Sequence, residues 1–437
     1  MPVHRIPGGK GGAVFADRAE IDAWLVQPKV AADVGALPPH IDAIQGTENR
    51  PNVQAHDGVS SRSPVGASTV RRLAPIAIGL IVLAGVAATV IRIQTAGTVV
   101  PATFEFKAGT LIAHTPDDAV LWTFQLPEQP GSVVDGAVVG TVGLIGTARA
   151  NLHGHHPDAL ALVSMSRVAD SLNAESPLRS EVYCLSSNGR LRWMFYPRNR
   201  LTFAGREFAG PWRIWAWTVL PGSKPHLWVS SSDNVWWPTV IVSLDAAGKA
   251  ETVFVNSGHI AALAPAQFGG ARYVLAGGVN NEYRSAMLAM LDSEGEPSSS
   301  PQTAGTPFAC DQCPGGVPHR YFLFPRMEVA AAASVPYEYA NLINATPGAP
   351  IEVSVRDMTA LNVRAVYRFS EGLMPESVAM SDRYWEIHRE MSRNGTLDHP
   401  PEDCPERNDG VIVRMWQPGT GWSNIKVLPT FAPRETH

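Results

Sequence analysis

The chain has 437 residues, of which 45% are hydrophobic and 17% charged, and its formal net charge is −5. This weakly acidic balance excludes a general electrostatic attraction of the whole protein to nucleic acid. Four cysteines in a chain of this length exclude a fold built mainly on disulfides, although one or two bridges are compatible with an oxidising compartment.

The first 27 residues predict a small ordered element. Two short strands are expected at 3–6 and 13–16, joined by a glycine-rich loop, because glycine permits the positive φ values of a tight hairpin. A short amphipathic helix should follow over 17–25, with Asp17 as its N-cap.

This hairpin and helix resemble the wing and last helix of the excisionase/MerR-like winged helix-turn-helix family, through the residues RIPGG and VFADRAEIDAWL. The two helices that would form the helix-turn-helix itself do not occur here, and further residues upstream would be needed to supply them. A wing without the groove-reading helix lacks specificity for DNA. Nucleic-acid binding is therefore not expected of the chain as given.

Residues 28–70 contain five prolines among Ala, Gly, Ser and Asp, without a sustained hydrophobic period. This composition predicts a disordered linker.

An uncharged apolar run at 73–91 follows, close to the ~20 residues that a helix needs to span a bilayer. It predicts a transmembrane helix at 73–94. More Arg and Lys residues precede the run than follow it, which places the N-terminus in the cytoplasm. We thus expect a single-pass inner-membrane protein with residues 100–437 in the periplasm or outside the cell. A cleaved signal peptide and a buried core helix are the alternatives.

From residue 100 onward the dominant pattern is short apolar strands separated by polar turns. Hairpins are predicted at 111–126, 182–196, 240–255 and 410–428, and a further strand and turn open the segment 286–302. The four turns before residue 300 fall at Asp117-Asp118, Asn188-Gly189, Ala247-Gly248 and Glu294-Gly295. Asn-Gly between alternating apolar runs is a strong hairpin signal.

Additional strands at 159–165, 226–231 and 273–277 precede three of these hairpins, and Trp122 and Trp193 occupy matching places in two of them. The turns recur after 71, 59 and 47 residues, near the ~40–50 residues of a propeller blade. The units resemble the quinoprotein-like, FG-GAP and WD40-like β-propellers of exported bacterial proteins. We therefore predict a mainly β fold, a β-propeller-like domain of six or seven blades at 100–437, with a β-sandwich as the competing fold.

One segment departs from the β pattern. Residues 381–393 carry apolar side chains at helical spacing, with Ser381 or Asp382 as a cap and Asn394-Gly395 as a terminator. A helix packed on the rim of the β domain is expected here.

The cysteines suggest two alternative sites. Cys310 and Cys313 form half of a tetrahedral zinc site, which His319, His399 or Cys404 could complete. The chain has no second closely spaced pair, so a disulfide is favoured over a metal, for instance between one of the pair and Cys404. A thioredoxin-like redox role would require a helix start, and the Pro-Gly-Gly that follows the pair argues against one.

Two further groups of residues are candidate binding sites. The histidines His153, His155 and His156 could hold a transition metal, but loop histidines are more often solvated. Seven of the twelve tryptophans lie between residues 193 and 237, which favours core packing. Trp236 and Trp237 are the best candidates for exposure to a partner.

The sequence contains no GxSxG elbow, HExxH motif or phosphate loop. It therefore predicts a binding or scaffolding module for a protein or peptide partner, with no enzyme activity and no cofactor. One alternative is a transmembrane regulator that couples an exported sensor to a completed DNA-binding domain. Another is an exported quinoprotein-like enzyme, although fold alone does not carry function.

Overall fold

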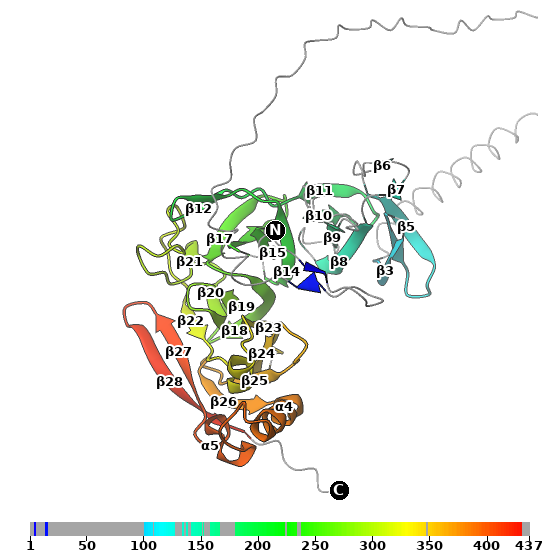
Figure 1. The fold of residues 1–437 in the computed structure, drawn as a ribbon. Coiled ribbons are helices and arrows are strands. Elements are labelled where there is room, and N and C mark those ends of the chain that lie inside the picture. The colour runs from blue at the N-terminus through cyan, green and yellow to red at the C-terminus, as the bar shows by residue number, and fades with distance from the viewer. Residues whose placement is uncertain are drawn as a thin grey trace, which may run out of the picture. The chain divides into compact units, whose positions relative to one another are not determined.

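The computed structural model (Figure 1) describes residues 4–5, 14–15, 100–107, 109–126, 133–134, 137–138, 141–150, 152, 158–166, 180–222, 225–233, 237–346 and 348–430. The chain divides into two units, Met1–Arg72 and Leu73–His437.

In the first unit the structure describes one pair of strands. β1 (His4–Arg5) and β2 (Val14–Phe15) are antiparallel, with His4 opposite Phe15. Their positions agree with the hairpin expected from the sequence. The helix predicted at 17–25 and the linker at 28–70 lie outside the described residues.

The predicted transmembrane helix requires a correction. Among the described residues, no helix is both long and apolar enough to cross a membrane, and the segment 73–94 itself lies outside them. The described α-helices have five, twelve and four residues, well short of the ~20 that a bilayer requires. In the part of the chain that the structure describes, the fold class is thus mainly β, and the transmembrane helix of the predicted fold class has no counterpart there. Hydropathy by itself records only a lack of charge, so it predicts such a helix without establishing one.

Three smaller sheets come first among the described strands of the second unit, and their strands are antiparallel and follow one another in chain order except for β21. The first sheet contains β3 (Thr103–Lys107), β4 (Thr110–His114) and β5 (Val120–Gln125). The second contains β8 (Thr141–Ala150), β9 (Asp158–Ser166), β10 (Ser180–Leu185) and β11 (Leu191–Phe195). The third contains β14 (Trp212–Leu220), β15 (His226–Asp233), β16 (Thr239–Leu244), β17 (Ala250–Asn256) and β21 (Ser298–Ser299), which runs parallel to β17.

Two small hairpins accompany these sheets. They consist of β6 (Val133–Val134) with β7 (Ala137–Val138), and of β12 (Leu201–Phe203) with β13 (Arg206–Phe208).

A ten-stranded sheet contains most of the remaining chain. One antiparallel meander is β18 (Ile260–Phe268), β19 (Ala271–Asn280), β20 (Ser285–Asp292) and β22 (Arg320–Leu323). The other is β23 (Glu338–Asn344), β24 (Ile351–Asp357), β25 (Arg364–Phe369) and β26 (Pro375–Met380). The hairpin β27 (Val411–Gln417) and β28 (Gly421–Pro429) joins them, because β27 pairs with β22 and β28 pairs in parallel with β26.

The predicted hairpins at 111–126, 182–196, 240–255 and 410–428 are confirmed by strand pairing. The turn glycines Gly189 and Gly248 have φ values of +78° and +80°, which favour glycine. The last hairpin bridges two meanders within one sheet, whereas propeller blades are separate sheets. The propeller and its blade number therefore remain predictions.

A repeated tryptophan contact connects successive sheets. The Nε1 of Trp122 on β5 donates to the carbonyl of Ser187 at 2.8 Å, and its ring covers Gly189 so closely that a Cβ there would lie 2.7 Å from it. Trp193 on β11 repeats this arrangement over Gly248 and donates to a carbonyl of that turn at 2.8 Å. The matching positions of the two tryptophans in the sequence thus correspond to equivalent packing contacts.

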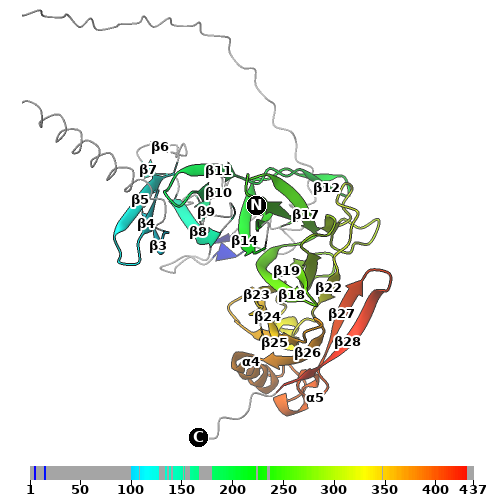
Figure 2. The ribbon, with the colours of Figure 1, turned by 180° about the vertical axis from the view of Figure 1, so that it is seen from behind.

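Short helices interrupt the last part of the chain. They are α3 (Glu328–Ala332), α4 (Asp382–Arg393), the 3₁₀ turn η1 (Pro401–Asp403) and α5 (Pro405–Asn408). α4 confirms the predicted helix, with Ser381 Oγ accepting from the N–H of Tyr384 at 3.3 Å. In both ribbon views α4 lies beside β25 and β26 (Figure 2), and Tyr384 and Ile387 join the core formed with those strands.

Candidate metal centre

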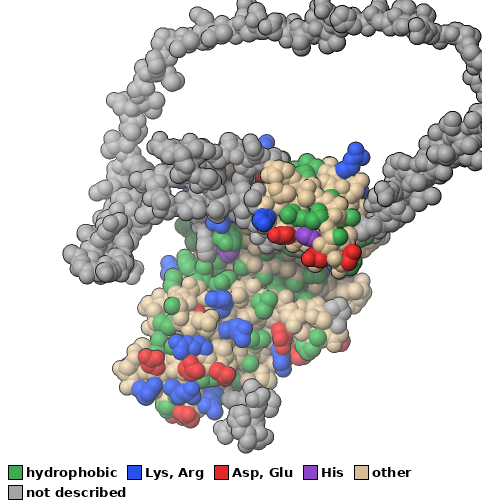
Figure 3. All heavy atoms as spheres, turned by 90° about the vertical axis from the view of Figure 1, so that its right-hand side faces the viewer, with side chains coloured by type: hydrophobic (Ala, Val, Ile, Leu, Met, Phe, Trp, Pro, Cys, Tyr) green, Lys and Arg blue, Asp and Glu red, His purple; other side chains and the backbone are tan. Residues whose placement is uncertain are grey.

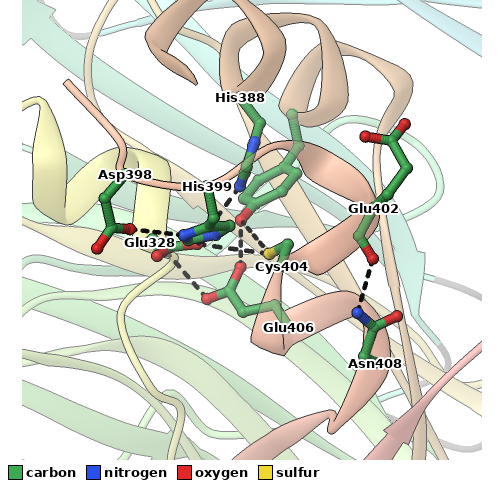
Figure 4. Close-up of polar contacts among 9 residues, drawn as sticks. Glu328, His388, Asp398, His399, Glu402, Cys404, Glu406 and Asn408 are labelled. Atoms are coloured by element: carbon green, nitrogen blue, oxygen red, sulfur yellow. Dashed lines mark hydrogen bonds and ion pairs between the residues drawn. The ribbon is translucent and has the colours of Figure 1, made fainter. Parts of the chain in front are cut away.

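Four side chains that can bind a metal converge beside α4. Glu328 is the first residue of α3, His388 lies within α4, His399 follows that helix, and Cys404 separates η1 from α5. One donor atom from each lies within 4.8 Å of the others. Figure 4 shows these side chains pointing toward one another from separate elements.

The distances around Glu328 match a tetrahedral arrangement. Its Oε2 lies 3.5 Å from His388 Nε2, 3.3 Å from His399 Nε2 and 3.4 Å from Cys404 Sγ. Zinc bonds of about 2.0–2.3 Å at tetrahedral angles place nitrogen and oxygen ligands about 3.3 Å apart and sulfur and oxygen ligands about 3.5 Å apart. The three distances from Glu328 Oε2 therefore match those between zinc ligands, and all four donors lie within 4.8 Å of one another.

The two imidazoles present nitrogens that the described protein atoms leave without a hydrogen bond. His388 is completely buried, and neither of its ring nitrogens makes a hydrogen bond to the described residues; the same holds for Nε2 of His399. Both Nε2 atoms face Glu328 Oε2 only at ion-pair distance. Leaving a buried polar atom unpaired costs about 1–3 kcal/mol. Burial lowers the pKa of His388, which favours the neutral imidazole that metal coordination requires. A cation between these nitrogens would satisfy both.

Asp398 orients one of the histidines. Its Oδ1 lies 2.8 Å from Nδ1 of His399, and this hydrogen bond is the main reason that the pKa of His399 is raised. A proton held on Nδ1 leaves the lone pair of Nε2 free to face Glu328 and Cys404. Carboxylates that orient a metal-binding histidine in this way are common around zinc.

A second carboxylate supports the start of α3. Glu406 accepts the backbone N–H of Glu328 at 3.0 Å through Oε1 and the hydroxyl of Tyr384 through Oε2. Burial raises the pKa of Glu406 to about 7. Burial also raises the pKa of Cys404 to about 11, so its thiol needs a bound cation to become a thiolate at neutral pH.

The residues of the zinc site predicted from the sequence do not lie together in the structure. Cys310 and Cys313 form a disulfide with each other, so neither thiolate can bind a metal. Cys404 belongs to the cluster described above, and the ring of His319 packs instead on Tyr273 at 5.2 Å. The favoured disulfide is present, but it joins Cys310 to Cys313 and leaves Cys404 as a free thiol.

Sequence reasoning named two of the four clustered residues, His399 and Cys404, and missed Glu328 and His388. His388 lies within the stretch 381–393 that the sequence predicts as a helix packed on the β domain, and Glu328 lies 60 positions before it. The available signal was the spacing of His388, His399 and Cys404 within one segment rich in Pro and Asp. No spacing rule connects that segment to Glu328, which only the fold brings close.

The remaining predicted binding residues give no exposed site among the described residues. Trp237 is half-buried, and its ring lies 4.9 Å from Phe208, 5.1 Å from Phe308 and 5.5 Å from Phe203. Trp236 and the histidines at 153–156 lie outside the described residues.

The comparisons with known proteins add no assignment. No protein-family model matches this sequence, and no curated protein shows significant similarity to it. The resemblances to winged-helix and propeller families therefore stay predictions.

Proposed function

We propose that this chain is a zinc-binding protein that holds one Zn²⁺ between α3, α4 and the segment that precedes β27. The observation that carries this proposal is the position of Glu328 Oε2, which lies at tetrahedral edge distances from the donors of His388, His399 and Cys404.

The ligand types favour zinc over other common cations. Ca²⁺ and Mg²⁺ prefer sites made wholly of oxygen ligands, whereas imidazole and thiolate favour zinc or copper. The carboxylate of Glu328 is also a ligand type that zinc accepts together with imidazole and thiolate. Four protein ligands leave no open position for substrate, as in structural sites. The proposed role is therefore structural, in agreement with the predicted binding or scaffolding module.

The decisive experiment is metal analysis of the purified full chain, followed by replacement of the metal with Co²⁺. One equivalent of zinc and a sulfur-to-cobalt charge-transfer band are expected. Cys404→Ser should abolish the band, while Cys184→Ser should keep it, because Cys184 is buried on β10, outside the cluster. A full-length protein that binds no zinc when reconstituted, or a band that persists in Cys404→Ser, would contradict the proposal.

The partner of the binding or scaffolding module remains a prediction. On the face in Figure 3, acidic and basic side chains are interspersed among the coloured residues of the lower part, without a large patch of one sign. Such a surface gives no electrostatic preference for nucleic acid. The expectation of a protein or peptide partner comes from the sequence alone, and a pull-down with the full chain would test it.

A further inference from the structure

Three of the four proposed zinc ligands come from a single insertion. The chain leaves the sheet after β26, at Met380, and returns at Val411, where β27 begins. His388, His399 and Cys404 all lie within this interval. Glu328 is the one ligand that belongs to another part of the fold, between β22 and β23. A bound metal would therefore connect the insertion to the sheet.

The first half of the insertion has its own hydrophobic anchors. On α4, Tyr384 and Ile387 are buried in the core of the ten-stranded sheet, and Leu397 joins them just after the helix. Trp385 and Met391 pack against the same core. Burying a large apolar side chain stabilises by roughly 1.5–3 kcal/mol. This half can therefore remain attached without a metal.

The second half, residues 398–410, lacks such apolar anchors. Apart from those of Cys404, its side-chain hydrogen bonds to α3 and α4 come from Glu406, which accepts from the N–H of Glu328 and from the hydroxyl of Tyr384. Its sequence DHPPEDCPERNDG contains no Ala, Val, Leu, Ile, Met, Phe, Tyr or Trp, and Pro401 and Cys404 are its only buried residues. Its two short helices, η1 and α5, have no side-chain hydrogen bond at their N-caps. Ordering each residue costs roughly 1–2 kcal/mol of backbone entropy. Apolar burial within this segment is too small to offset that cost.

We propose, resting on the zinc-binding function above, that the metal orders residues 398–410 and so fixes the entry of the chain into β27. In zinc-dependent domains the free energy of metal binding is itself folding free energy. Zinc would bind His399 and Cys404 of this segment and also Glu328 of α3. The metal would therefore connect the segment to α3. Without metal, the sheets and α4 remain folded while residues 398–410 open.

Hydrogen exchange of the full chain tests this proposal. The exchange of backbone amides is followed by mass spectrometry in the zinc-loaded protein, after treatment with a chelator, and after zinc is added back. We expect amides of 398–410 to exchange at least tenfold faster without zinc and to recover when it returns. Amides of β15 and β16 should not change, because those strands lie in another sheet.

A matched pair of variants separates the metal from general effects of sequence. Glu328→Gln removes a ligand charge and should reproduce the fast exchange of 398–410 at limiting zinc. Glu402→Gln makes the same chemical change within the segment itself. The side chain of Glu402 is exposed and takes no part in the cluster (Figure 4), so this variant should behave like the natural protein.

The outcomes distinguish this inference from the proposed function. If zinc binds and its removal leaves the exchange of 398–410 unchanged, the ordering role is wrong and zinc binding stands. If no zinc binds to the full chain, the zinc-binding function itself fails. If removal speeds exchange equally in β15 and β16, the metal stabilises the whole fold and the local role is refuted.

Discussion

The contact between Trp193 and Gly248 allows a quantitative test of how successive sheets pack. Gly248 has a φ of +80°, and a Cβ at this position would lie 2.7 Å from Cγ of Trp193, at the base of a ring anchored by its hydrogen bond to Ala246. A non-glycine residue at positive φ costs roughly 1 kcal/mol, and overpacking typically adds about 1–3 kcal/mol. Gly248→Ala should therefore lower the free energy of unfolding by about 2–4 kcal/mol.

Urea unfolding followed by tryptophan fluorescence measures this loss, and the chain provides a matched control. Gly205 has a φ of +78°, and a Cβ there would meet no atom within 4 Å. Gly205→Ala thus reports the backbone cost alone, roughly 1 kcal/mol. Equal losses for the two variants would refute the reasoning, because the contact with Trp193 would then contribute nothing to the effect.

Three further predictions concern the C-terminal part of the chain. Asp398→Asn should weaken zinc binding about 10–100-fold by loosening the orientation of His399; an unchanged affinity in a chelator competition would rule out this positioning role. Ser381→Ala removes the cap that accepts from the N–H of Tyr384 at 3.3 Å and should cost about 1 kcal/mol, measured by urea unfolding; no loss would mean that another group caps α4. Burial raises the pKa of Glu338 from 4.5 to about 8. Between pH 4.5 and about pH 8 the folded state therefore retains a proton that the unfolded state loses, and the free energy of unfolding falls as the pH rises. Glu338→Gln should remove this decline, which is at most about 1.4 kcal/mol per pH unit; identical urea midpoints for both proteins across that range would contradict it.

Much of the strand pattern could be predicted because hairpins and helix ends are specified by neighbouring residues. Asn188-Gly189 and Ala247-Gly248 mark turns through backbone conformations that few other residues adopt. Ser381 and Asn394 bound α4 at the expected positions because capping groups act within one turn of the helix. The predicted transmembrane helix has no counterpart among the described helices, the longest of which has twelve residues, because an apolar run is necessary for such a helix but does not establish one.

The sequence by itself thus determined the mainly β class, the positions of the principal hairpins and the helix α4, because these depend on short-range patterns. The tertiary structure decided how β27 and β28 join two meanders, since strand pairing between distant segments leaves no local signal. It also decided which cysteines pair and which residue completes the cluster at Cys404. The fold of the sheet brings the Glu328 carboxylate next to that cluster. This contact joins residues far apart in the chain, so the spacing of residues in the sequence does not predict it.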